Sequence, residues 1–200
     1  MDTRAALQQE VMEALFAKIA HSGDGLCAPV SIRSAQIYLS ARHRDILFGD
    51  TPAETVGVTG SKGELEVPIV PGDAEQTRVE MSATEALGIG VRQMPVFDGT
   101  AKRGAPCVLR GSEGKVTLDA GVFAPQRRLC ISPAHAERYG LTEGQRIWAA
   151  AEHTERTLIF EHVVVCIGQD LHLALYLDLD EASAAGLADG QSVRLLTSLP

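Results

Sequence analysis

The chain is poor in positive charge. Its 200 residues hold 18 lysines and arginines against 26 aspartates and glutamates, for a formal net charge of −8. Binding to a phosphate backbone needs a basic face, so this balance argues against a nucleic-acid partner. No apolar run approaches the roughly 20 residues of a membrane-spanning helix, and the N-terminus lacks the apolar core of a signal peptide. We therefore expect a cytoplasmic protein with no membrane partner.

Cysteine is also scarce, and no Cys-x-x-Cys pair or zinc-ribbon spacing occurs. The four cysteines are Cys27, Cys107, Cys130 and Cys166. Three of them lie in apolar, strand-like surroundings, where a free cysteine usually acts as a small buried hydrophobe. The chain also lacks a Walker loop, a dinucleotide fingerprint and a serine-hydrolase elbow. We expect reduced thiols, no disulfides and none of these three common chemistries.

The first twenty residues have the pattern of an amphipathic helix. Its apolar stripe recurs at every fourth position and consists of Leu7, Val11, Leu15 and Ile19. We predict a helix within residues 1–20, followed by a glycine-rich linker at residues 21–28. A short helix on a linker cannot bury its own stripe. The stripe docks either on the chain's own domain or on a partner surface.

After this linker, the pattern changes to short segments bounded by Gly, Pro or Asp, most of them rich in β-branched residues. They include residues 65–70, 115–118, 157–165 and 171–177. Such segments are typical of β-strands. Many short strands with frequent turn signals favour barrels or sandwiches over a doubly wound sheet. The expected fold is therefore mainly β with short helices.

An internal repeat supports this expectation. Residues 131–147 align without gaps on residues 177–193, with a helix-opening Ser132 or Asp178 in each copy. Weaker copies occupy residues 79–89 and 39–49. In the copy at 39–49, His43 matches His135 of the copy at 131–147, and we expect both to be solvated side chains on the first turn of a helix. Repeats of this kind indicate duplicated units. The Gly- and Pro-rich stretch 95–106 suggests two halves, residues 29–100 and 101–200, that are free to exchange strands.

Residues 30–40 and 124–133 look like two copies of one motif. Both resemble the His-x-His-[Leu/Met]-Ser segments of the PduL-type phosphotransacylases (phosphate propanoyltransferases). These are zinc enzymes of bacterial microcompartments that exchange CoA for phosphate on a short acyl group. The resemblance covers nearly the whole chain. It implies two pseudo-symmetric small β-barrels with zinc and substrate between them, and an encapsulation peptide at residues 1–20 that binds shell or lumen proteins.

The metal ligands of the family are largely replaced in this chain. The five positions that resemble its histidines read Gln36, Tyr38, Arg128, Cys130 and Tyr176. A glutamate that resembles the remaining ligand is kept as Glu80, and the arginine that the family uses on substrate is kept as Arg92. Zinc sites use His nitrogen, Cys sulfur and carboxylate oxygen, and tyrosine phenols are poor ligands at neutral pH. We therefore expect no zinc and no other cofactor, with CoA as a candidate ligand.

Arginine at a former ligand position changes the charge of the pocket. Together with Arg92 and Arg127, Arg128 offers bidentate hydrogen bonds to phosphate, to a carboxylate or to the CoA phosphates. The alternative is structural, with Arg128 filling the vacated volume and pairing with Glu80. A nearby cation also favours a thiolate, so Cys130 is a candidate nucleophile.

Three functions follow from these readings. The first is a zinc-free pseudoenzyme with a structural or regulatory role in the microcompartment lumen. The second is an active phosphotransacylase that interconverts acyl-CoA plus phosphate and acyl phosphate plus CoA at an altered, metal-independent site. The third is the unaltered reaction, which requires new metal ligands. A homo-oligomer is compatible with each.

Overall fold

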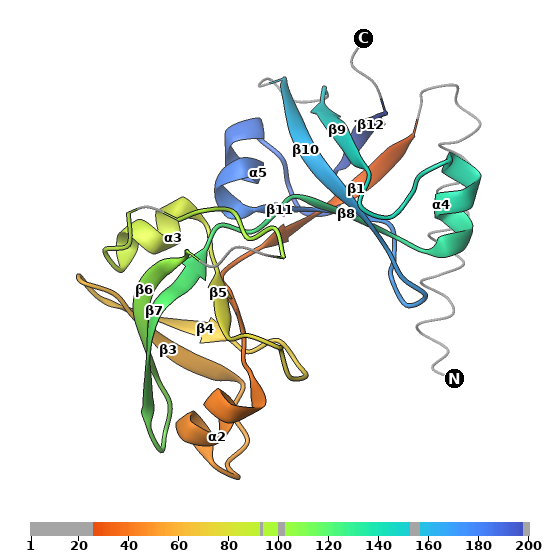
Figure 1. The fold of residues 1–200 in the computed structure, drawn as a ribbon. Helices are drawn as coiled ribbons and strands as arrows, with labels where there is room; N and C mark the ends of the chain where they lie inside the picture. The colour runs from red at the N-terminus through yellow and green to blue at the C-terminus, as the bar shows by residue number, and fades with distance from the viewer. Residues whose placement is uncertain (1–25, 93, 100–102, 153–156, 198–200) are drawn as a thin grey trace. The chain divides into compact units, whose positions relative to one another are not determined.

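The computed structural model describes residues 26–92, 94–99, 103–152 and 157–197 (Figure 1). The predicted helix of residues 1–20, with its stripe Leu7, Val11, Leu15 and Ile19, lies outside the described residues. So does most of the predicted linker. Within the described ranges, no helix combines the length and the apolar character that crossing a membrane would need. The described part is mainly β with short helices, which confirms the predicted fold class.

The chain forms two compact units, here called unit 1 and unit 2. Among the described residues, unit 1 comprises those up to Ser31, those of Arg128–Leu175 and those from Ala185 onward, and unit 2 comprises those of Ile32–Arg127 and Tyr176–Ala184. This division differs from the predicted halves, residues 29–100 and 101–200. Strands of residues 105–123 pair with strands of residues 55–59 and 78–80, so the Gly- and Pro-rich stretch near residue 100 lies inside unit 2.

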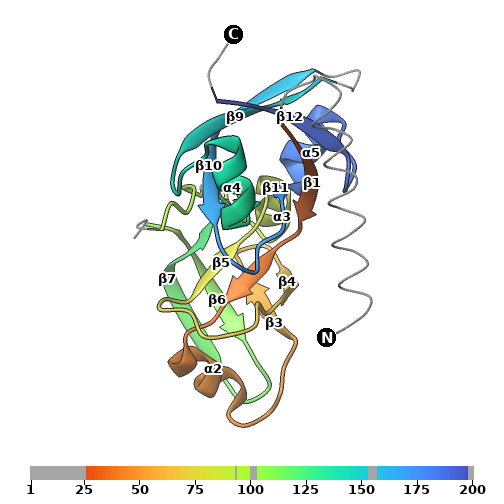
Figure 2. The same cartoon turned by 90° about the vertical axis from the view of Figure 1, so that its right-hand side faces the viewer.

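Unit 1 is built on a closed barrel of six strands. In the order of the barrel these are β1 (Cys27–Arg33), β11 (Ala174–Asp178), β8 (Arg128–Ile131), β10 (Leu158–Ile167), β9 (Arg146–Ala151) and β12 (Ser192–Leu196). Strand β10 runs parallel to β8 and antiparallel to β9, and the pairing of β9 with β12 can be followed in Figure 2. Helix α4 (Pro133–Tyr139) follows β8. Alternate residues along the strands point into the barrel, as fully buried Leu129 and Ile131 do.

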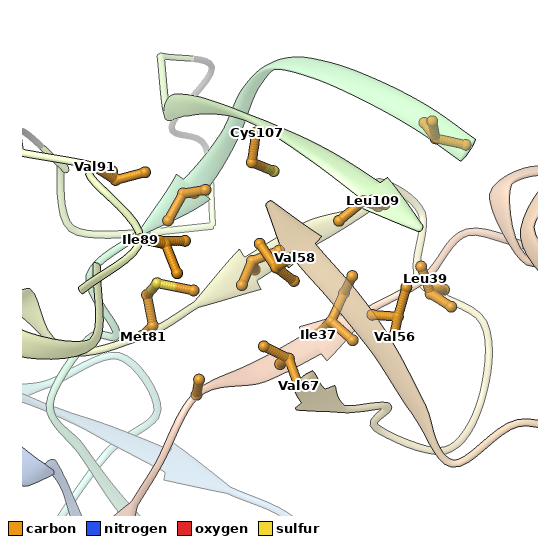
Figure 3. Close-up of a cluster of buried hydrophobic side chains, with 14 of the residues drawn as sticks. Ile37, Leu39, Val56, Val58, Val67, Met81, Ile89, Val91, Cys107 and Leu109 are labelled. Atoms are coloured by element: carbon orange, nitrogen blue, oxygen red, sulfur yellow. The ribbon is translucent and has the colours of Figure 1, made fainter. Parts of the chain in front are cut away.

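Unit 2 is built on a second sheet of six strands. Their order is β2 (Gln36–Tyr38), β5 (Arg78–Glu80), β7 (Lys115–Phe123), β6 (Ala105–Arg110), β3 (Thr55–Thr59) and β4 (Glu64–Pro68). A bridge between Ile37 and Ile69 brings the two edges of this sheet together. The helices are α2 (Ala41–Phe48), α3 (Ala83–Gly88) and α5 (Leu179–Ala185). Ile37, Val58 and Leu109 are completely buried in the apolar core of unit 2 (Figure 3).

The predicted repeat is present in the backbone. Gly140 and Gly186 both have φ of 65°, and Gly144 and Gly190 have φ of 73° and 78°. These left-handed values favour glycine, which explains the matching glycines of residues 131–147 and 177–193. The glutamine after the second glycine closes the turn in both copies. Its side-chain oxygen accepts a hydrogen bond from the backbone nitrogen three residues earlier, at 3.0 Å in one copy and 3.1 Å in the other.

The repeated helices also begin in the same way. Ser40, Ser82, Ser132 and Asp178 each accept a hydrogen bond from the backbone nitrogen three residues later. Such side-chain caps satisfy a backbone donor at the start of a helix and stabilise it by about 1 kcal/mol. The caps were predictable for Ser132 and Asp178, because each depends only on neighbouring residues.

Candidate functional site

Three of the former ligand positions lie on one face of the strand pair β2–β5 in unit 2. Gln36 stands opposite Glu80, and Tyr38 stands opposite Arg78. Alternate residues of a strand share a face, and residues opposite each other on paired strands share it too. The side chains of Gln36, Tyr38, Arg78 and Glu80 therefore meet on the same surface of the sheet. We call these four residues the Arg78 network.

Arg78 is the centre of this network. Its Nε donates a 2.7 Å hydrogen bond to Oε1 of Glu80, and the two side chains are only 16% and 10% exposed. Its guanidinium carbon also lies 3.8 Å from the ring centroid of Tyr38 and 4.4 Å from that of Phe97. A planar guanidinium suits both contacts, because it bonds a carboxylate through its edge and stacks on aromatic rings through its face.

The remaining positions of this unit are engaged by a second arginine. Oε1 of Gln36 accepts 3.4 Å hydrogen bonds from Arg33 Nη1 and from the Tyr38 hydroxyl. The Arg33 guanidinium carbon lies 3.7 Å from the ring centroid of Tyr176. The two hydrogen bonds are long and therefore weak. The four former ligand positions of unit 2 all have protein partners.

The residues present do not fit the zinc site that the resemblance implies. Glu80, the one carboxylate kept at a ligand position, is bonded to Arg78, and amide, phenol and guanidinium groups take the place of imidazoles. In the part of the chain that the structure describes, no three His, Cys, Asp or Glu side chains lie close enough together to hold a metal ion.

Unit 1 holds the other two former ligand positions, Arg128 and Cys130, on β8. The parallel register with β10 places Cys130 opposite Cys166 and Arg128 opposite Val164. Cys130 is buried, whereas Cys166 is half-buried. The sequence pointed to Cys130 as a candidate nucleophile; the geometry adds Cys166, which sequence reasoning missed. No local signal could have found it, because its neighbour is set by strand register.

The chemistry of Cys166 differs from that of an ordinary cysteine. A hydrogen bond from the Cys130 side chain and the positive charge of Arg128 lower the pKa of the Cys166 thiol to about 7, against the opposing effects of burial and of Glu143. Burial alone raises the pKa of Cys107 to about 12. Because the thiolate is the reactive form, Cys166 is expected to react more readily near neutral pH than Cys107.

The arginines of the predicted oxyanion site have different surroundings. Arg92 is exposed and lies in unit 2, and Arg128 is half-buried in unit 1. Arg127 donates a 2.5 Å hydrogen bond to Glu181, which lies in the first turn of helix α5. The Arg127 guanidinium is therefore paired with a residue of this helix. The alternative that paired Arg128 with Glu80 is not needed to neutralise that carboxylate, because Arg78 already does so.

Two histidines differ from their expected role as solvated side chains. Both His43 and His135 are half-buried. Nδ1 of His43 lies 2.8 Å from Thr77 Oγ1, and Nδ1 of His135 lies 2.8 Å from Ser132 Oγ. Burial, followed by the charge of Arg42, lowers the pKa of His43. Both imidazoles thus take part in hydrogen bonds near the N-termini of helices α2 and α4.

The fold defines a chain built of two six-stranded β units. A model of the phosphate propanoyltransferase family matches residues 51–188, and the chain belongs to that family. It is similar to the phosphate propanoyltransferases of Shewanella putrefaciens and Thermotoga maritima. Each is 32% identical to this chain over 84% of its length. The matched part covers 87% of the Shewanella protein and 88% of the Thermotoga protein. The phosphate propanoyltransferase of Sebaldella termitidis is 32% identical over 92% of this chain and 94% of its own length.

Proposed function

We propose that this member of the phosphate propanoyltransferase family is a zinc-free pseudoenzyme with a structural or regulatory role in the lumen of a bacterial microcompartment. The observation that carries the proposal is the Arg78–Glu80 pair. A zinc ion would need Glu80 as a ligand, and Glu80 is held by a cation of the protein itself. The stacking of Arg78 on Tyr38 adds to the cost of releasing it.

The test is the release of CoA from propanoyl-CoA on addition of phosphate, measured with added zinc and again with a chelator. We expect no phosphate-dependent release in either condition. Release that the chelator abolishes would overturn the proposal, because it would require a working metal site. The phosphate propanoyltransferase of Shewanella putrefaciens, assayed in parallel, shows that the assay detects the family's reaction.

The lumen location rests on the apolar stripe of residues 1–20. A fusion of residues 1–28 to a fluorescent protein, expressed together with microcompartment shell proteins, tests it directly. We expect the fusion to be enclosed by the shell, and Leu7→Asp together with Leu15→Asp to release it. Glu10→Ala, on the other face of the predicted helix, is the matched control and leaves enclosure unchanged. Enclosure that survives the double substitution would remove the support for an encapsulation peptide.

A second candidate function, metal-independent acyl transfer, is favoured by the thiols of unit 1. In this reaction the Cys166 thiolate attacks the thioester carbonyl of acyl-CoA, and CoA leaves as its thiolate. A phosphate oxygen then attacks the acyl-cysteine, which releases acyl phosphate and restores the Cys166 thiolate. Arg128, whose charge acts on the Cys166 thiol, is the candidate group for binding phosphate in this unit.

The same assay separates this candidate from the pseudoenzyme. Acyl transfer through Cys166 predicts CoA release that survives the chelator, and a protein mass increased by one acyl group before phosphate is added. Cys166→Ser would abolish both, and Arg128→Ala would weaken the phosphate-dependent step. Cys27→Ser is the matched control, since Cys27 lies on β1 of the same barrel. Absence of the acylated protein would exclude this candidate.

A further inference from the structure

Cys130 and Cys166 are neighbouring thiols on two paired strands of unit 1. They lie directly opposite each other on the parallel strands β8 and β10. Their side chains share a face of the barrel wall, because directly opposed residues of paired strands do so. The Cys130 side chain is hydrogen-bonded to the Cys166 sulfur.

The spacing of the two strands suits a disulfide. Neighbouring strands lie about 4.7–4.9 Å apart, within the range of about 4.4–6.8 Å that joins the Cα atoms of bonded cysteines. The Cys130 side chain lies close enough to Cys166 to lower the pKa of its thiol through a hydrogen bond. Neither cysteine is part of a disulfide in this structure. Joining them needs a small approach of the two strands, because bonded cysteines have Cβ atoms about 3.5–4.5 Å apart.

The two thiols also differ in the way that thiol–disulfide exchange requires. Cys166 is half-buried and accessible to a small reagent, whereas Cys130 is only 8% exposed. The pKa of the Cys166 thiol is lowered to about 7, whereas burial raises that of Cys107 to about 12, so Cys166 carries the larger fraction of thiolate at neutral pH. An attacking thiol is most effective when its pKa lies near the ambient pH.

We propose that Cys130 and Cys166 form a redox-active dithiol that a low-molecular-weight disulfide such as oxidised glutathione converts reversibly into an intramolecular disulfide. The Cys166 thiolate attacks one sulfur of oxidised glutathione, forms a mixed disulfide and releases one glutathione thiolate. Cys130 then loses its proton, attacks the Cys166 sulfur and releases the second glutathione. Two protein thiols are oxidised, and one glutathione disulfide is reduced to two glutathiones.

Peptide mapping of the full chain tests the proposal without any variant. Trypsin places the four cysteines in four different peptides, residues 19–33, 104–110, 129–138 and 157–194. After treatment with oxidised glutathione and blocking of free thiols, we expect peptide 129–138 linked to peptide 157–194. The intact protein loses the mass of two hydrogen atoms, and dithiothreitol restores both thiols. A link to any other cysteine peptide, or glutathione adducts alone, would overturn the proposal.

Variants test the order of the two steps. In Cys130→Ala the second step is missing, so glutathione remains attached to peptide 157–194. In Cys166→Ala neither the mixed disulfide nor the link forms, and Cys130 stays reduced. Cys27→Ser is the matched control from the same barrel and forms the link as the original chain does. An adduct that accumulates on Cys130 in Cys166→Ala as fast as on Cys166 in Cys130→Ala would refute Cys166 as the attacking thiol. None of these readouts depends on acyltransferase activity, so the redox pair stands or falls separately from the proposed function.

Discussion

Arg78 holds Glu80 by a 2.7 Å hydrogen bond from Nε to Oε1, and both side chains are largely buried. Residues two positions apart on a strand share a face, as Arg78 and Glu80 do. The ion pair is therefore local in sequence. The aromatic partner Tyr38 comes from the neighbouring strand β2. Arg78 and Glu80 thus form a buried ion pair, and the proposal of a zinc-free site rests on this pair.

The first prediction concerns the stability of this pair. Arg78→Ala leaves a buried carboxylate without its cation, which typically costs about 3–5 kcal/mol of the free energy of unfolding. We expect a loss near the lower end of this range, measured by urea denaturation. Arg110→Ala is the matched control, because the Arg110–Glu64 pair is 56% and 43% exposed and should contribute about 0–1 kcal/mol. Equal losses in the two variants would contradict a buried, structural role for Arg78.

The second prediction concerns zinc. A metal that binds only the folded state raises its stability by about 2.7 kcal/mol at a hundredfold excess over the dissociation constant. We expect neither zinc nor a chelator to change the melting temperature, because the retained carboxylate is bonded to Arg78. The variant Cys130→Ala with Cys166→Ala controls for zinc taken up by the two thiols. A chelator that lowers the melting temperature of the original chain would show that a metal site exists.

Structural features that depend on consecutive residues could be predicted from the sequence, whereas features that depend on contacts between distant residues could not. The glycines of the repeat and the cap at Ser132 were predictable, because a positive φ or a helix cap depends on a few consecutive residues. The mainly β fold was predictable from segment length and composition. The division into units was not, because it depends on which distant strands pair.

The candidate site shows the same limit. That Gln36 and Tyr38 stand at the histidine positions of the motif is a prediction from the sequence. The stacking of Arg78 on Tyr38 could not be predicted, because it depends on the β2–β5 register that brings Tyr38 opposite it. Cys166 was missed for the same reason, since only the β8–β10 register makes it a neighbour of Cys130.

The third prediction concerns the reactivity of Cys166. Its rate of alkylation by iodoacetamide should rise with pH around a midpoint of about 7. Cys130→Ala removes the hydrogen bond that contributes most to the lowered pKa, so the midpoint should move upward, and Arg128→Ala should move it upward by less. The alkylated peptides separate Cys166 from the other thiols. A midpoint unchanged by Cys130→Ala would show that the hydrogen bond does not set the pKa.

The fourth prediction concerns His43 and pH. Its pKa is lowered from the ordinary value of 6.5, chiefly by burial. Below 6.5 the unfolded state therefore binds more protons than the folded state, and stability is lost as the pH falls through this range. His43→Gln removes the titrating group, so the variant should lose less stability than the original chain between pH 7 and about pH 5. Urea denaturation at several pH values measures this difference. Parallel curves for the two proteins would contradict a lowered pKa.

The last prediction contrasts two glycines that differ only in backbone conformation. A Cβ atom added at Gly88 or at Gly140 would meet no atom within 4 Å, so neither substitution creates a clash. Gly140, however, has φ of 65° at the end of α4, whereas Gly88 lies within α3 without a positive φ. Gly140→Ala should therefore destabilise the protein by about 1 kcal/mol. Gly88→Ala should stabilise it by about 0.4–1 kcal/mol, because alanine reduces the freedom of the unfolded chain. Thermal or urea unfolding of the two variants measures both signs. Destabilisation by both would mean that contacts, and not the local φ, decide these positions.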